Sequence, residues 1–316
     1  MSHETLVTAE PPAVGYPGGM PTTAVTSLTG ASTGESQLRR NLKRFLIGNK
    51  LNLIGLIIVI VFFLLAVFGQ ALAPYDPYAQ DITGSKLLAP DLAHPMGTDE
   101  LGRDLLSRVM TGTRISLQVA AVVLTFAVVF GTLIGSIAGY FGGFVDEILM
   151  RFTDMFLAFP ALILAIAIAA SLGRELHWTM VALATVFWPW YARLVRGQIL
   201  SIRERDYVTA AESIGLSGPR LLARHILPNA VSVIIIQLTL DIGYAILATS
   251  SLSFIGLGAQ PPSPEWGTMM STARNYFREA WWYTTFPGLA LTLTVFAFNV
   301  LGDGLQDALD PRSGRR

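Results

Sequence analysis

Long apolar stretches with at most one charged residue each recur along this chain. Six of them approach or exceed the roughly 20 apolar residues that a helix needs to cross the hydrocarbon layer. They cover residues 51–75, 115–145, 155–173, 178–194, 231–249 and 285–301. Pro160 stands near the start of the third, Pro189 near the end of the fourth, and Asp241 inside the fifth. The pattern predicts an all-α membrane protein with six transmembrane helices.

The composition supports this reading. Of 316 residues, 52% are hydrophobic and 14% are charged, with a mean hydropathy of +0.51, which is too apolar for one soluble core. The formal net charge is zero, which gives no sign of a nucleic-acid partner. The chain contains no cysteine, which excludes disulfides, thiolate catalysis and cysteine-based metal sites.

The positive charges predict how the chain is oriented. With the N-terminus inside, 15 of the 22 Lys and Arg residues fall on inner segments and seven on outer ones. An excess of positive charge marks the cytoplasmic side of a membrane protein. Because six spans return the chain to its starting side, both termini are expected to be cytoplasmic.

The remaining segments follow from these spans. Residues 1–36, rich in Pro, Gly, Thr and Ser, are expected to be a disordered tail without a signal-peptide pattern. Residues 37–50 form a basic amphipathic pattern that suits a helix in the inner headgroup layer. Alternatively, their charges serve only as a topology signal. The other expected parts are a first transmembrane helix at 51–73, an external segment at 74–114, a five-helix core at 115–302 and a cytoplasmic tail at 303–316.

The external segment contains a predicted helix. Thr98 suits its N-cap, with Asp99 in the first turn. Asp99–Arg103 and Asp104–Arg108 have the i, i+4 spacing of helical ion pairs. We expect this helix to lie along the outer membrane surface. There it either contacts a partner or shapes an external gate, through Asp99, Arg103 and Asp104, or it is scaffold.

The core contains a long cytoplasmic loop at 193–230. Within it, residues from Asp206 to Ile214 predict a short helix, and Gly215 suits its left-handed C-terminal cap. Ser217 is a plausible cap for a second helix that starts at Gly218. One side of the first helix collects Tyr207, Ala210, Ala211 and Ile214. Such a helix suits docking into a groove of another protein, or it rests on the membrane surface.

This loop resembles the coupling motif of ABC importer permeases. Five residues fall in register with the family pattern, namely Ala210, Ala211, Gly215, Leu227 and Pro228. Thr209 and His225 depart from it, because the family has Glu and Ile there. The stretches "HPMGTDELGRDLLSR", "SLSFIGLGAQPPSPEWG" and "FNVLGDGLQDALDPR" resemble the C-type permease of the dipeptide, oligopeptide and nickel group. Thr249 stands where many such chains have Glu.

The resemblance implies a type I ABC importer permease fold in a bacterial cytoplasmic membrane. It also implies a B-type permease as partner in a heterodimer, two ATPase subunits or one fused ATPase, and an extracytoplasmic substrate-binding protein. ATP and Mg would bind to the partners, since this chain has no P-loop. The resemblance assigns ATPase coupling to Asp206, Tyr207, Ala210, Ala211, Ile214, Gly215, Leu216, Leu227 and Pro228.

Asp241 and Thr249 are candidates for the translocation path. An ionisable group within a span usually faces a cavity or a partner. Asp241 could meet a peptide's amino terminus, hold a helix interface, or lie at a shallower depth. Asp303, Asp307 and Asp310 share a helix face, but their position favours caps and salt bridges over a metal site.

Several functions remain open at this stage. Peptides are the first choice of substrate, and nickel or another small solute is the second. Two further classes are a secondary transporter driven by an ion gradient and a membrane scaffold without transport. No motif of a hydrolytic enzyme occurs in the chain, which disfavours a membrane enzyme.

Overall fold

Helices form most of the folded chain. The computed structural model describes residues 50–309, and within them no strand is present. The long helices are α2 (Lys50–Leu72), α3 (Leu105–Phe141), α6 (Leu176–Arg203), α9 (Leu227–Phe254) and α11 (Trp281–Leu309). The shorter ones are α4 (Gly143–Leu157), α5 (Ala161–Leu172), α7 (Asp206–Ser213), α8 (Gly218–Leu221) and α10 (Trp266–Ala273), with the π-turn η2 (Leu222–Ile226) and the 3-10 turn η3 (Arg274–Tyr276).

Four stretches of helix are long and apolar enough to cross a membrane, namely α2, α3, the run from Gly218 to Phe254 and α11. A fifth results if α4 and α5 are counted as one bent span. Helix α6 covers the predicted fourth span but is not among these apolar stretches. The chain is a multi-pass membrane protein, while the count of six and the location of the termini stay predictions. The predicted tail at 1–36, the basic helix except for Lys50, and residues 310–316 lie outside the described residues.

The predicted second span, at 115–145, corresponds to α3 as far as Phe141, and only its last residues lie outside that helix. Helix α3 ends at Phe141, and Gly142 and Gly143 have φ angles of 66° and 53°. Glycine adopts such left-handed conformations readily, and they interrupt a right-handed helix. The uncharged run therefore contains the end of one helix and the start of the next.

The predicted third span, at 155–173, is wrong as one helix. Helix α4 ends at Leu157, α5 begins at Ala161, and the two are bent by 83°. Pro160 has no N–H to donate, and its ring disfavours the helical conformation at Phe159. The proline near the start of this run therefore separates two helices.

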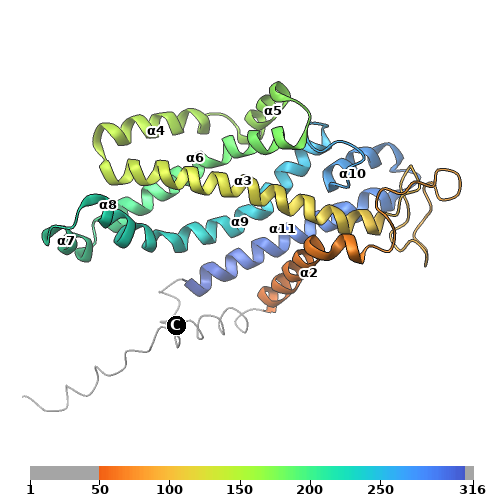
Figure 1. Cartoon of the computed structure of the whole chain (residues 1–316), viewed down its shortest axis with the longest axis horizontal. Coiled ribbons are helices and arrows are strands. Elements are labelled where there is room, and N and C mark those ends of the chain that lie inside the picture. The colour runs from red at the N-terminus through yellow and green to blue at the C-terminus, as the bar shows by residue number, and fades with distance from the viewer. Residues whose placement is uncertain (1–49, 310–316) are drawn as a thin grey trace, which may run out of the picture. The chain divides into compact units, whose positions relative to one another are not determined.

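The regions of predicted function lie at opposite ends of the long helices (Figure 1). Helices α7 and α8 are at one end, while α10 and the segment from 73 to 104 are at the other. The two regions are therefore separated along the helices, while the side of the membrane on which each lies stays a prediction.

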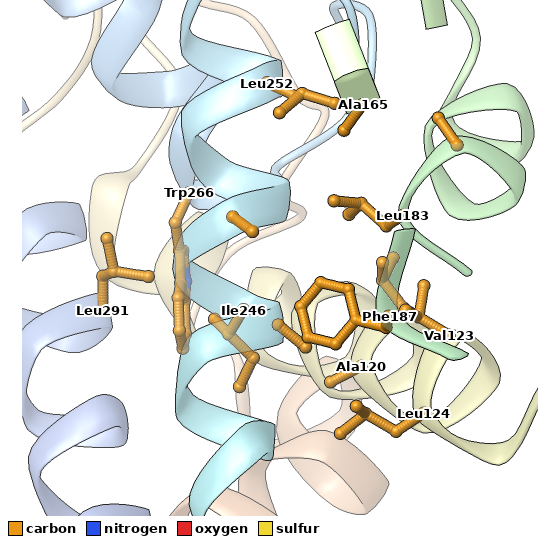
Figure 2. Packing of buried hydrophobic residues seen from close by; sticks show 14 of the residues in the cluster. Ala120, Val123, Leu124, Ala165, Leu183, Phe187, Ile246, Leu252, Trp266 and Leu291 are labelled. Atoms are coloured by element: carbon orange, nitrogen blue, oxygen red, sulfur yellow. The ribbon is translucent and has the colours of Figure 1, made fainter. Parts of the chain in front are cut away.

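Helices α3, α6 and α9 enclose the centre of the apolar packing. Figure 2 shows Val123 of α3, Leu183 and Phe187 of α6 and Ile246 of α9 in one buried cluster. Trp266 of α10 is fully buried in the same cluster. By contrast, α2 buries only four of its 23 residues, as expected of a helix that faces lipid or another subunit.

Three glycines spaced four residues apart, Gly131, Gly135 and Gly139, bring α3 against α6. A Cβ atom at Gly135 would lie 2.3 Å from the carbonyl oxygen of Ala192, and one at Gly131 would lie 2.5 Å from the Cβ of Tyr191. Small residues at this spacing are typical of membrane helices, because lipid supplies no hydrophobic drive for helices to associate. The two backbones can therefore approach until their atoms touch.

We predict that Gly135→Ala destabilises the protein. The added methyl group would force α3 and α6 apart, and overpacking of this kind typically costs about 1–3 kcal/mol. Gly197→Ala on α6 is the matched control, because a Cβ there meets no atom within 4 Å. That control should be neutral or stabilising by about 0.5–1 kcal/mol through helix propensity. Thermal unfolding in detergent measures both, and equal melting temperatures would contradict the close contact.

Candidate functional site

The first candidate region is the short helix α7 in the predicted cytoplasmic loop. It begins at Asp206, where a carboxylate favours the positive end of the helix, and its cap is Ile214. Gly215 follows with a φ of 84°, and the N–H of Leu216 donates to the carbonyl of Ala211 at 3.2 Å. This is the left-handed helix end that the sequence predicts.

The two faces of α7 differ from the prediction in one respect. Val208 and Ala211 are 0% and 8% exposed and pack in a buried cluster with residues of α6 and α9. Tyr207 and Ile214 are 41% and 79% exposed, and Ala210 is exposed beside them. Ala211 therefore faces the interior of its own chain. The prediction that it shares one exposed face with Tyr207, Ala210 and Ile214 is wrong. The small side chain of Ala211 lets α7 lie close to its own chain.

A turn at residues 214–217 joins α7 to α8, and from Gly218 onward the backbone is helical into α9. Ser217 stands at the N-cap of α8, as predicted, and the turn η2 joins α8 to α9 without a loop. Leu221 and Ile226 are fully buried on this link. Leu227 and Pro228 form the first turn of α9 directly after η2, and Pro228 has no N–H to donate to that preceding turn.

The second candidate region is a cavity of about 280 Å³ next to Asp241. The Tyr191 hydroxyl donates to Asp241 Oδ2 at 2.7 Å, and the Gln237 amide donates to Oδ1 at 3.0 Å. The cavity is bounded by the end of α4, the start of α5, α6 and α9, with the lining residues Leu157, Ala161, Val186, Phe187, Trp190, Gln237, Asp241 and Tyr244. It therefore lies beside the bend at Pro160.

Thr249 does not line this cavity. It is buried, and its hydroxyl donates to the carbonyl of Ala245 at 2.8 Å within the same helix. Thr249 therefore packs among the helices of its own chain, and the path proposed below does not include it.

The third candidate region is a buried cluster of charges at the outer end. The predicted helix start at Thr98 is wrong, because α3 begins at Leu105 with Asp104 as its N-cap. The backbone turns at Gly102, whose φ is 73°. The carboxylate of Asp99 accepts from the Arg103 N–H at 2.9 Å and from its Nε at 2.6 Å. The i, i+4 spacing therefore forms a buried turn.

Charged partners surround this turn. Arg103 also contacts Glu100 at 2.9 Å, and the Tyr283 hydroxyl of α11 donates to Glu100. Arg108 lies 3.4 Å from Asp99 instead of pairing with Asp104, and it donates to the carbonyl of Pro77 at 2.9 Å. Asp99, Arg103, Asp104 and Arg108 are all buried. The predicted exposed surface helix is therefore wrong here, and the charges join the outer segment to α3 and α11.

Asp104 has a separate set of partners. Its Oδ2 accepts from the Ser107 N–H at 2.8 Å and from the Ser107 hydroxyl at 2.7 Å, which caps α3. Its Oδ1 lies 2.9 Å from Nδ1 of His94. Each oxygen of this buried carboxylate therefore has a hydrogen-bonding partner.

Two sets of charged residues were missed by sequence reasoning. Glu265 is fully buried at the N-cap of α10, where it accepts from the Ser250 hydroxyl at 2.9 Å. Arg196 forms a two-point pair with Asp146 of α4 at 2.5 and 2.6 Å, and Arg193 contacts Asp154 at 2.5 Å. The sequence does contain a signal for these acids, because each stands beside an apolar stretch. Sequence reasoning could not choose the partners, because Ser250 is 15 residues from Glu265, and Arg193 and Arg196 are 39 and 50 residues from Asp154 and Asp146.

Comparison with known proteins places these features in a family. Residues 131–315 match the family described as the binding-protein-dependent transport system inner membrane component. Residues 36–90 match the N-terminal transmembrane domain of oligopeptide transport permease C.

Individual relatives cover most of the chain. It is 45% identical over 267 residues to the probable D,D-dipeptide transport system permease protein DdpC of Escherichia coli. The aligned region covers 84% of this chain and 89% of that relative. It is 45% identical over 264 residues to the dipeptide transport system permease protein DppC of Alkalihalophilus pseudofirmus, covering 84% and 86%. It is also 45% identical over 254 residues to the glutathione transport system permease protein GsiD of Escherichia coli, covering 80% and 84%.

The matched residues include α4 to α11 and therefore the short helix α7, the cavity at Asp241 and the buried acid Glu265. The predicted resemblance is confirmed: the chain belongs to the family of binding-protein-dependent transport system inner membrane components and is a permease subunit of an ABC importer.

Proposed function

We propose that this chain forms half of the translocation path of an ATP-driven importer for dipeptides or similar short peptides. Relatives named for transport of D,D-dipeptides, dipeptides and glutathione support this substrate class. These molecules share a primary ammonium group and a carboxylate. The complex would sit in a bacterial inner membrane, with a B-type permease and an extracytoplasmic substrate-binding protein. ATP and Mg would bind to two ATPase subunits or one fused ATPase.

The observation that carries the proposal is the arrangement of α7. Its outer face presents Tyr207, Ala210 and Ile214, while Val208 and Ala211 fix it to the chain. An exposed apolar face on a short helix suits insertion into a groove of another protein. The buried contacts of Val208 and Ala211 with α6 and α9 would carry movement of α7 to α9, which is continuous with α8 and η2.

Reconstitution tests the proposed function directly. The chain, its partner permease, the ATPase and the substrate-binding protein are incorporated into vesicles, and uptake of labelled alanyl-alanine is measured. We expect uptake that requires ATP and the substrate-binding protein. Uptake driven by an ion gradient without ATP would contradict the proposal, as would absence of peptide uptake by an intact complex.

We predict that Ile214→Asp uncouples ATP hydrolysis from transport. A charge on the exposed apolar face would have to be desolvated against the ATPase, and uptake should fall at least about tenfold, equivalent to about 1.4 kcal/mol. Folding should be unaffected, because Ile214 is 79% exposed. The measurements are peptide uptake and ATP hydrolysis stimulated by the substrate-binding protein.

The matched control is Thr209→Asp, which introduces the same charge on an exposed part of α7 away from this face. It should retain uptake, since Thr209 is exposed and the family motif that the loop resembles has Glu at this position. Equal loss in both variants would indicate general damage to the loop and contradict a specific docking face. Ala211→Asp is unsuitable, because it would bury a charge.

We further propose that the buried charges at the outer end hold the external surface in a fixed shape for the substrate-binding protein. Asp99, Arg103 and Asp104 are 0%, 3% and 3% exposed, so their role would be indirect. The cluster joins the outer segment to α3 and α11 through ion pairs and the Tyr283 hydroxyl. A fixed surface lowers the entropy cost of binding a partner.

We predict that Asp99→Asn destabilises the protein by about 3–5 kcal/mol, the usual cost of removing one member of a buried ion pair. The two arginines near Asp99 would lose their shared carboxylate. Glu147→Gln is the control, because its pair with Arg151 is exposed and worth little. Unfolding in detergent measures both. Similar stability of the two variants would show that the buried cluster contributes no more than a surface pair.

A further inference from the structure

Asp241 lies halfway along its helix. It is 14 residues after Leu227 and 13 before Phe254, which places it about 20 Å from either end at 1.5 Å per residue. Its carboxylate lines a cavity whose other walls come from α4, α5 and α6. Such a position is costly for an ionisable group unless the open side meets water, a ligand or another protein.

The groups that hold Asp241 leave its charge uncompensated. Its two hydrogen-bond donors, Tyr191 and Gln237, are neutral. A carboxylate has about four acceptor positions, and these donors occupy two. Among the residues that line the cavity there is no Lys, Arg or His. The contrast with Asp99 is plain, because Asp99 is paired with Arg103 and lies near Arg108.

The walls of the cavity are also suited to a cation. Three aromatic residues line it, namely Phe187, Trp190 and Tyr244, and the rings of Phe187 and Tyr244 are 5.4 Å apart. The faces of aromatic rings attract ammonium groups, and the attraction increases when water is excluded. A carboxylate beside several aromatic rings is therefore a chemical match for an organic ammonium ion.

We propose that this cavity is a binding subsite for the primary ammonium group of the transported peptide. Asp241 accepts hydrogen bonds from the ammonium, Gln237 and Tyr191 hold the carboxylate in place, and the aromatic residues surround the adjacent carbon atoms. At about 280 Å³, against the ≈ 30 Å³ of one water, the cavity has room for an amino-acid residue. The inference deepens the proposed peptide import and rests on it for the identity of the cargo.

Charge-selective labelling tests the subsite independently of transport. The chain has no cysteine, so Ala161→Cys places a single thiol on this chain at the cavity wall. In the intact complex, the thiol is treated with 2-aminoethyl or 2-sulfonatoethyl methanethiosulfonate, and modification of this chain is followed by mass. After correction for reaction with free cysteine, the cationic reagent should react about tenfold faster, because the carboxylate attracts it.

Substitution of Asp241 decides the source of that selectivity. With Asp241→Asn, the ratio of the cationic to the anionic labelling rate should fall to near one. With Asp241→Glu instead, most of the roughly tenfold preference for the cationic reagent should remain. Ala121→Cys, in an apolar groove on α3, is the control thiol, and its ratio should not respond to Asp241→Asn. The proposal is overturned if the ratio at Ala161→Cys is unchanged by Asp241→Asn, or if neither reagent reaches this thiol.

Uptake by the reconstituted importer gives the second measurement. Asp241→Asn should lower alanyl-alanine uptake at least about tenfold, while ATP hydrolysis stimulated by the substrate-binding protein persists. Thr239→Ala on the same helix, outside the cavity lining, should leave uptake unchanged. Normal uptake by Asp241→Asn would refute the subsite. If the wild-type complex imports no peptide, the proposed function fails, and the labelling ratio alone still decides whether the cavity selects cations.

Discussion

The close contact between α3 and α6 is the constraint on which both candidate regions within the core depend. Gly131 and Gly135 leave room for the backbone around Tyr191 and Ala192, and Gly139 does the same near Ile199. Helices in lipid gain no hydrophobic energy from association, so small residues must supply close packing. This contact fixes Tyr191, whose hydroxyl holds Asp241, and it fixes the end of α6 from which α7 departs.

Contacts with α6 also explain why the bend between α4 and α5 can be tolerated. A broken helix in a membrane exposes backbone groups, which is permitted only beside protein or a cavity. Here α4 is held to α6 by the pairs Asp146–Arg196 and Asp154–Arg193, while the cavity lies next to the bend. These two pairs thus add contacts with α6 to a short helix that buries little of its own surface.

Sequence reasoning succeeded where the physical constraint is local and failed where it depends on distant partners. Apolar runs predicted α2, α9 and α11, and Asp206 with Gly215 predicted the limits of α7, because caps are local chemistry. The breaks at Gly142 and Pro160 were missed, because hydropathy reports the length of an apolar stretch and not where the helix axis changes direction. Likewise, the spacing of Asp99 and Arg103 fits both a helix and a tight turn, and only the left-handed Gly102 distinguishes them.

Two prolines interrupt helices between the buried charges of the outer end and the helical link of the inner end. At the outer end, Asp99 and its arginines are buried together, and at the inner end α8, η2 and α9 are continuous. Between them, Pro189 interrupts the hydrogen bonds of α6 next to Trp190, and Pro160 separates α4 from α5. Both interruptions lie beside the cavity that contains Asp241, because Ala161 and Trp190 line it. A displacement of α6 or α4 that bends these helices at Pro189 or Pro160 would therefore change the shape of this cavity.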